Sequence, residues 1–170
     1  TNVISITDGQ IFLESSLFFS GMRPAVNVGL SVSRVGGDAQ TKAMKKAAGS
    51  LRIDLAQYRE MEGFTQFSSD LDDATKEQLE YGGGLMELLK QPLGKPMSLA
   101  EKVITLCAAR HKVMLGIPTA KVKGFQMDML SYFASAHPEI AREIEETKDL
   151  SKELSQKIVE IAEEFKKSRC

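Results

Sequence analysis

The residue with the clearest chemical potential in this sequence is Arg34, which closes the stretch Pro24–Arg34 on a connector rich in glycine and serine. A guanidinium is permanently charged, planar and forked, so it can stabilise the negative charge that spreads over phosphoryl oxygens. Most arginines are solvated surface groups, and the residue type alone favours no function. The case for Arg34 therefore depends on the sequence around it.

Other patterns that could bind phosphate are weak. The sequence contains no G-x-x-x-x-G-K-[ST] motif, whose backbone amides would cradle phosphates. The glycine cluster Gly82–Gly84 follows Glu77 and Glu80, whose carboxylates would repel phosphate. We expect a kink or break in a helix at these glycines instead of a binding loop.

The histidines and cysteines do not suggest a metal centre. His111 and His137 have no Cys, His or Asp at the spacing of metal ligands, so no metal site is expected. Cys107 and His111 stand four residues apart and could form a catalytic pair, but we favour a small buried thiol beside a helix-end histidine. The remaining acidic groups are typical of solvated helix faces: Glu60, Glu62, Glu143, Glu145 and Glu146. No set of residues thus forms a complete active site.

Composition limits the class of protein. The chain has 170 residues, enough for one ordinary domain or for one domain with part of another. A net charge of −1 and a pI of about 6.1 give no electrostatic reason to expect nucleic acid binding. No apolar run approaches the ~20 residues that span a bilayer.

The first 40 residues predict a small amount of strand. Two short strands, Val3–Thr7 and Gln10–Leu13, flank the turn signal Asp8-Gly9, and a short helix and a loop follow. A hairpin alone is marginal in water. We therefore expect the chain to begin inside a larger domain.

From about residue 41 the hydrophobic period becomes 3.6. One amphipathic helix is predicted from Met44 to Phe64, and a second from Asp70 or Asp72 until Pro92 ends it. Ser98 and Glu101 form a capping box for a third helix, and Gly116–Pro118 separates it from a fourth. Pro138 begins a short fifth helix, and Ser151 opens the last. The expected fold is mainly α, a helical bundle after a strand-containing remnant.

The sequence resembles the alpha subunit of F-type ATP synthases over nearly its whole length. The stretch from Pro24 to Arg34 resembles that family's signature, and residues 4–11 resemble a strand segment of its nucleotide-binding domain. The segments 47–51 and 55–60 resemble the first long helix of its C-terminal domain, and 66–72 resembles the loop that faces the rotor. Asn27–Leu30 favours alpha over the catalytic beta subunit, which usually carries Asp-Pro-Leu-Asp there.

The resemblance implies a division of the chain. Residues 1–40 would be the C-terminal end of a P-loop α/β nucleotide-binding domain, and residues 41–170 the C-terminal α-helical domain. Arg34 would act as an arginine finger in the neighbouring catalytic beta site, and Arg23, Pro24 and Gln91 would lie near the adenine of the nucleotide that alpha itself binds. The family usually has Gln-Tyr after the position of Pro92, where this chain has Leu93-Gly94.

The resemblance also implies cofactors, partners and a location. A full subunit would bind ATP or ADP with magnesium, and the chain by itself would bind none and be inactive. The partners would be the beta subunit, the gamma subunit of the central stalk and the delta subunit of the peripheral stalk, in a rotary proton-translocating complex. Its place would be the cytoplasmic face of the cell membrane, as a peripheral bacterial-type protein. The alternative is a stand-alone helical interaction module without nucleotide chemistry.

Overall fold

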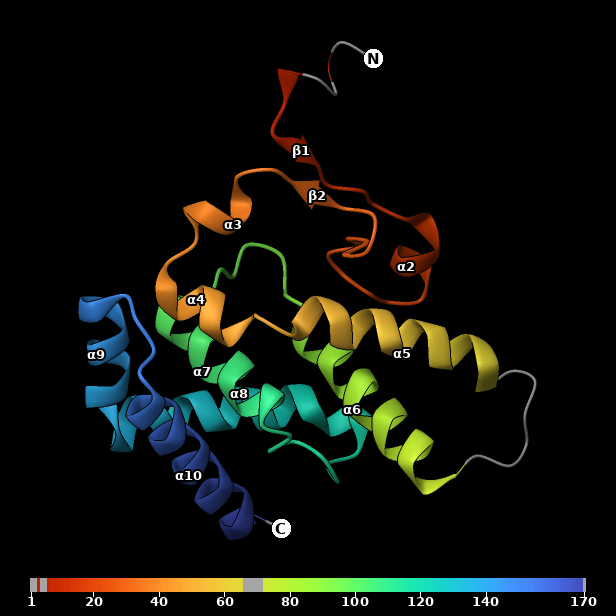
Figure 1. Ribbon diagram of the computed structural model, residues 1–170. Helices are drawn as coiled ribbons and strands as arrows, with labels where there is room; N and C mark the ends of the chain where they lie inside the picture. The colour runs from red at the N-terminus through yellow and green to blue at the C-terminus, as the bar shows by residue number, and fades with distance from the viewer. Residues whose placement is uncertain (1–2, 4–5, 66–71, 170) are drawn as a thin grey trace.

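The computed structural model describes residues 3, 6–65 and 72–169. A short N-terminal part contains β1 (Gly9–Gln10), α2 (Ser15–Phe19), β2 (Val32–Ser33) and α3 (Gly36–Ala39). The helical part follows, with α4 (Lys42–Ala47), α5 (Leu51–Thr65), α6 (Asp73–Leu89), α7 (Leu99–Arg110), α8 (Thr119–Ala136), α9 (Pro138–Thr147) and α10 (Lys152–Arg169). Figure 1 shows the N-terminal part lying on one side of the helical layers. The chain is thus mainly helical with a small two-stranded remnant, as expected.

The predicted hairpin of Val3–Thr7 and Gln10–Leu13 is wrong. Val3 and Ile6 are helical, and the Thr7 amide donates to the Val3 carbonyl at 3.1 Å. Instead, β1 pairs antiparallel with β2, with Gly9 opposite Ser33. A Cβ on Gly9 would lie 1.8 Å from the Val32 carbonyl oxygen, so the glycine allows a close approach of two strands and does not make a turn.

The helix predicted from Met44 to Phe64 is two helices. Thr41 caps α4 by accepting from the Met44 amide at 3.2 Å, and residues 48–50 separate α4 from α5. Gly49 lies in this break, where its poor helix propensity favours an interruption that the hydrophobic spacing does not reveal. Asp70, one of the two predicted starts of the second helix, lies outside the described residues.

Helix α6 begins where the sequence predicted, and it is not interrupted at the glycines that were expected to break it. Asp72 caps the helix, with its Oδ1 accepting from the Thr75 amide at 3.0 Å. The helix then continues without interruption through Gly82–Gly84 to Leu89, so the expected break is wrong. Gly82 is buried against Tyr58 of α5, and this close helix contact explains a glycine inside the helix.

The remaining helix ends match their sequence signals. Ser98 and Glu101 form the predicted capping box, with bonds of 3.1 and 2.6 Å. Gly116 has a φ of 84° in the turn before Pro118, and Pro138 is the first residue of α9. These signals are local side chain-to-backbone interactions, so they could be identified without knowledge of the fold.

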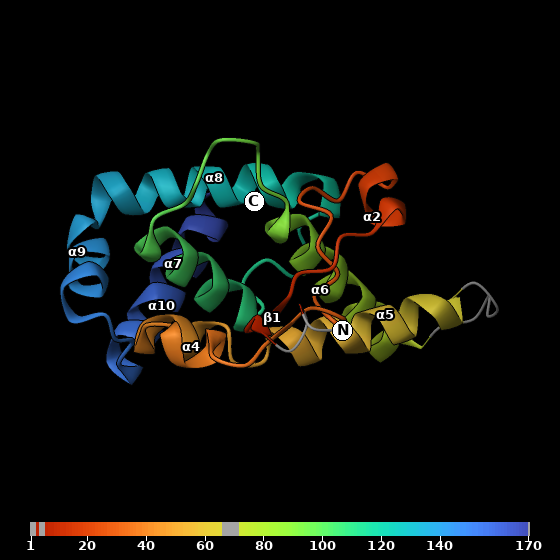
Figure 2. The same cartoon turned by 90° about the horizontal axis from the view of Figure 1, so that it is seen from above.

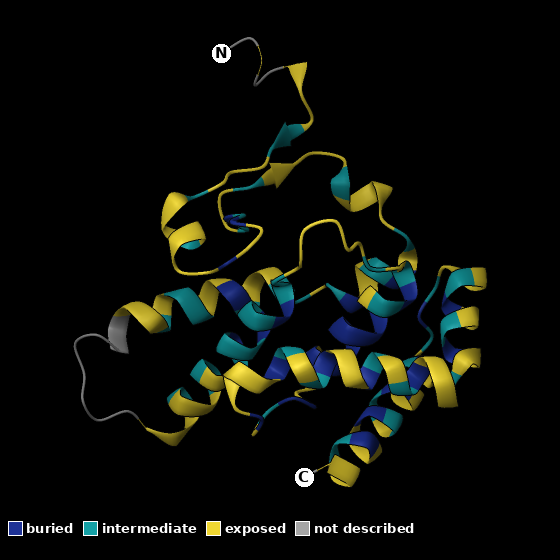
Figure 3. Ribbon diagram, turned by 180° about the vertical axis from the view of Figure 1, so that it is seen from behind, coloured by how far each residue is buried: buried dark blue, intermediate teal, exposed yellow. Residues whose placement is uncertain are grey.

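The core is centred on α7. This helix packs against α4, α8, α9 and α10, and eight of its twelve residues are buried, which Figure 3 shows as dark ribbon. Figure 2 shows α7 between α8 on one side and α4 on the other. The largest fully buried side chains include Ile104, Met129, Phe133, Ile140, Ile144 and Ile158. Among the described helices, none is both long and apolar enough to cross a membrane.

Candidate functional site

Arg34 is exposed at the end of β2, where the short sheet fixes its backbone. Its amide donates to the Asp8 carbonyl at 2.7 Å, and its Nη2 donates to the Thr7 carbonyl at 2.5 Å. Next to it in the chain, the Ser33 hydroxyl accepts at 2.8 Å from the amide of Gly36, the first residue of α3. Within the described ranges, no carboxylate forms an ion pair with Arg34, so the charge of this guanidinium is not neutralised inside the chain.

A buried polar network holds the segment that leads to Arg34. Asn27 is 6% exposed, and its Nδ2 donates to the Glu14 carboxylate at 2.6 Å. Its Oδ1 accepts from Nη1 of Arg59 at 2.8 Å and from the Leu30 amide at 3.0 Å. Arg52 of the same helix, α5, donates to the Gly29 carbonyl at 3.1 Å. Two arginines of α5 thus bind the stretch between Pro24 and Arg34.

Neither Asn27 nor Arg59 was predicted to be a functional residue. A signal was available, because Asn27 is a polar residue among the apolar residues Ala25, Val26 and Val28. A buried polar side chain requires hydrogen-bond partners, so such a position points to a structural network. Its partner Arg59 lies 32 residues away and could not be chosen from spacing alone.

Arg23, Pro24 and Gln91, which the resemblance places at the adenine, are close together. The Gln91 amide donates to the Arg23 carbonyl at 2.9 Å, which joins the loop after α6 to the segment after α2. The Arg23 guanidinium lies 4.3 Å from the ring centre of Phe18. Nε2 of Gln91 donates to the Lys95 carbonyl at 2.9 Å. All three predicted residues are exposed, so this edge is open to a ligand.

The four predicted site residues therefore form two separate groups. Arg23, Pro24 and Gln91 share one edge, formed by the segment after α2 and the loop after α6. Arg34 bonds to residues 7 and 8 beside the strand pair.

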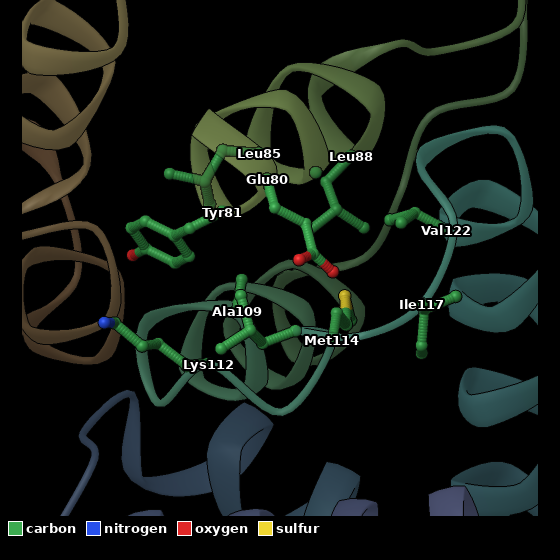
Figure 4. A pocket seen from close by; sticks show the side chains of 11 residues that line it. Glu80, Tyr81, Leu85, Leu88, Ala109, Lys112, Met114, Ile117 and Val122 are labelled. Carbon is green, nitrogen blue, oxygen red and sulfur yellow. The ribbon is translucent and has the colours of Figure 1, made fainter. Parts of the chain in front are cut away.

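A small pocket lies between α6, α7 and the turn before α8. Figure 4 shows the Glu80 carboxylate directed toward Met114 among apolar side chains. Glu80 accepts from the Gly116 amide at 2.6 Å, and Lys112 forms a 2.7 Å ion pair with Glu77. The cavity measures about 10 Å³, the space of a single water. The hydrogen bond from Gly116 to Glu80 therefore joins the turn to α6, and the cavity is too small for an organic ligand.

Cys107 is a buried core thiol. It is 2% exposed, and its Sγ lies 3.2 Å from the Ser155 hydroxyl of α10, whereas His111 is exposed. Burial raises the pKa of Cys107, which opposes formation of a nucleophilic thiolate. The structure thus agrees with the buried-thiol interpretation over a Cys107–His111 pair. Within the described part of the chain, no group of three His, Cys, Asp or Glu side chains could hold a metal ion.

Two family models match the chain. The model described as ATP synthase alpha/beta chain, C terminal domain, matches residues 40–165, and that of the ATP synthase alpha/beta family, nucleotide-binding domain, matches residues 1–33. The first of these covers most of the chain and corresponds to the helical part.

Curated relatives agree with these models. The chain is 56% identical over 167 residues to ATP synthase subunit alpha of Clostridium kluyveri, and the matched region covers 98% of this chain and 33% of the relative. It is 53% identical over 165 residues to the same subunit of Petrotoga mobilis, covering 97% of this chain and 33% of that one. For Mycolicibacterium smegmatis the identity is 53% over 167 residues, with 98% and 30% covered. The chain spans about a third of the length of these relatives.

Proposed function

The chain belongs to the ATP synthase alpha/beta family and corresponds to the C-terminal portion of an alpha subunit, and from this premise we propose that Arg34 is an arginine finger for the catalytic site of a neighbouring beta subunit. In this role the guanidinium stabilises charge on the phosphoryl group as it is transferred. In GTPases such a finger raises the catalytic rate by a factor of roughly 10³–10⁵.

The observation that supports this proposal is the exposed guanidinium with only neutral partners. Arg34 bonds to the Thr7 carbonyl, which orients the side chain without cancelling its charge. The Asn27 network and the bond from Arg52 hold the preceding segment on α5. A catalytic cation needs both conditions, a fixed position and a charge left free for the phosphoryl oxygens.

We also propose that Arg23, Pro24 and Gln91 border the adenine of a nucleotide bound by the full-length subunit. The nucleotide would be ATP or ADP with magnesium. The hydrogen bond between Gln91 and Arg23 supports this proposal. It brings together two exposed residues that are 68 positions apart in the sequence, so that they form one edge. Leu93 is fully exposed beside this edge and has no side-chain donor or acceptor, so adenine recognition there would depend more heavily on Gln91.

The partners that we propose are the beta, gamma and delta subunits of a proton-translocating rotary complex, attached peripherally to the cytoplasmic face of a bacterial membrane. Large apolar side chains of the N-terminal part are exposed and suited to such contacts, namely Ile11, Leu13, Phe19, Leu30 and Val35. A domain boundary near residue 40 is consistent with the change from this open part to the helical core. Of the loop expected to face the rotor, residues 66–72, all but Asp72 lie outside the described residues.

The test replaces Arg34 with Lys or Ala in a full alpha subunit assembled with its partners. Arg34→Lys keeps the charge but loses the planar fork, so turnover per assembled complex should fall far more than the yield of assembly, and Arg34→Ala should lose more. Arg110→Lys is the matched control, because Arg110 is also exposed and also donates to a backbone carbonyl, that of Lys46 at 2.6 Å. That control should retain near-normal turnover.

Normal turnover with Arg34→Lys would end the arginine-finger assignment. A drop in assembly yield or thermal stability with unchanged turnover would instead make Arg34 a structural anchor of its loop. The comparisons give no support to the alternative of a helical interaction module without nucleotide chemistry, since both matching models belong to the ATP synthase family.

A further inference from the structure

A groove of about 600 Å³ lies where the ends of α4 and α7 meet the first turns of α10. We call it the α4–α10 groove and define it by six polar residues of its lining, namely Lys46, Arg110, His111, Ser151, Lys152 and Gln156. Its volume lies within the usual range of small-molecule sites. Neither Arg34 nor any residue of the proposed adenine edge lines it, so it is a separate feature of the molecule.

The charge of this lining has one sign. Lys46 comes from α4, Arg110 from the end of α7 and Lys152 from the start of α10. All three residues are exposed, and no Asp or Glu among the described residues lines the groove. A concave surface with charges of one sign concentrates the electric field and attracts counter-ions. The groove is therefore suited to an anion.

The three cations are only partly neutralised within the chain. Lys46 forms a 2.7 Å ion pair with Asp149, which does not itself line the groove. Arg110 donates to the Lys46 carbonyl at 2.6 Å, a neutral partner that leaves its charge in place. Lys152 forms no ion pair in the described part of the chain, and Glu153 beside it does not line the groove. One of the three cations is thus paired with a carboxylate, and the other two remain to attract a ligand.

Hydrogen-bond donors lie beside these cations. The half-buried Ser151 accepts from the Leu154 amide at 3.0 Å, and its hydroxyl hydrogen can still donate to a ligand. The exposed His111 has at least one ring N–H in either protonation state. The first turn of α10 adds the positive end of an 18-residue helix, and Arg110 offsets the negative end of α7. Negatively charged oxygens would therefore meet both charges and donors.

We propose that the α4–α10 groove binds small anions that carry two or more negative charges on phosphate or carboxylate oxygens. Lys46 and Lys152 meet these oxygens, while Arg110, held by the Lys46 carbonyl, contributes through its field. Leu150 and Val159 are the only apolar residues of the lining within the described ranges, so a compact polar ligand is favoured over an extended apolar one. This binding depends neither on the arginine finger nor on the adenine edge.

The test is a titration of the ¹⁵N-labelled 170-residue chain with pyrophosphate, followed by NMR at constant ionic strength. The chain contains no Walker A sequence, so a phosphate-binding loop cannot produce the signal. Pyrophosphate should shift the backbone amide signals of residues 151–156 in a saturable way. Citrate is the second probe, because it offers carboxylate oxygens in place of phosphate oxygens. Saturable binding of either polyanion supports the proposal, and the tighter of the two identifies the preferred oxygens, whereas acetate, with one charge, should give no saturable shift.

Lys152→Gln removes one charge from the groove and should weaken pyrophosphate binding about five-fold, near the upper end for an exposed ion pair. Lys167→Gln is the matched control, because Lys167 is also exposed on α10 and its loss changes the net charge by the same amount. It lies about 22 Å further along the helix, where its field is screened at physiological ionic strength. The control should therefore keep the affinity of the native chain.

Gln156→Glu is the second variant. It places a carboxylate in the groove with almost no change in size, and Gln156 is exposed, so the fold should be kept and binding should weaken. Equal weakening in Lys152→Gln and Lys167→Gln would show attraction to the net charge alone and would overturn the proposal. The same holds for no saturable shift with either polyanion, for acetate binding as tightly as pyrophosphate, and for unchanged binding in both Lys152→Gln and Gln156→Glu.

Discussion

Gly82 of α6 lies directly against the ring of Tyr58 of α5. A Cβ on Gly82 would lie 2.3 Å from Cδ2 and 2.5 Å from Cβ of Tyr58, closer than real contacts allow. Gly83 and Gly84, its neighbours in sequence, have no such contact, since their nearest atoms would lie at 3.8 and 4.0 Å. The contact with Tyr58 thus explains the glycine at position 82 but not those at 83 and 84.

The first prediction follows from this contact. Gly82→Ala should lower the free energy of unfolding by about 1–3 kcal/mol, because α5 and α6 must move apart to accept the methyl group. Gly84→Ala should raise it by about 0.5–1 kcal/mol, since alanine is the better helix former and has space there. Urea unfolding followed by circular dichroism measures both changes. A stabilising Gly82→Ala would show that the two helices separate without cost.

The second prediction concerns the capping box of α7. Ser98→Ala should cost about 1 kcal/mol, because the Glu101 amide loses its acceptor at the start of the most buried helix. Ser131→Ala, on the exposed side of α8, is the control and should be neutral or slightly stabilising. The measurement is the melting temperature of the two variants in thermal unfolding. Equal melting temperatures would exclude a contribution of this cap to stability.

The third prediction is a loss of stability at alkaline pH caused by Tyr81. Burial and then the Asp54 carboxylate, 3.1 Å away, raise the pKa of Tyr81 from 10.0 to about 12. The folded state therefore keeps its proton where the unfolded state has lost it. This contribution is complete below pH 10 and is lost as the pH rises from 10 to about 12.

The measurement is the free energy of unfolding of the native chain and Tyr81→Phe at several pH values between 9 and 12. The native chain should lose stability more steeply, and the difference between the two isolates Tyr81, because Tyr58 and Cys107 are present in both. Parallel curves would show that the pKa of Tyr81 is not raised by folding.

The fourth prediction concerns activity. The 170-residue chain alone should not hydrolyse ATP, because it contains no Walker A sequence to hold the phosphates. The assay is phosphate release after rigorous removal of contaminating ATPases, with Arg34→Ala as a control for any residual rate. Steady turnover by the purified chain that Arg34→Ala abolishes would contradict this prediction.

The parts of the fold that could be predicted are those set by neighbouring residues. Asp72, Ser98 and Pro138 begin helices through bonds or backbone angles within a few positions, so their patterns identified the helix starts. The hydrophobic period of 3.6 identified the helical region, although it did not reveal the break at Gly49.

The errors occurred where a distant segment decides the conformation. Gly9 was interpreted as a turn residue, but it pairs with Ser33 of β2 and lies close to the Val32 carbonyl. Gly82 was interpreted as a breaker, but Tyr58 requires a glycine there. The site shows the same limit, since the resemblance named Arg23 and Gln91, and only the structure shows the hydrogen bond between them.

The attachment of the segment before Arg34 to α5 has a mechanical consequence. Arg52 and Arg59 are two turns apart on α5, so the helix forms hydrogen bonds with this segment at two points along its length. Fifteen residues of helix form a rod about 22 Å long. If this rod tilted by about 10° around one end, its other end would move by about 4 Å and its middle by about half of that, on the same geometry. A tilt of α5 by that angle would therefore shift the Asn27–Arg59 bond near its midpoint, and with it the segment before Arg34, by about 2 Å.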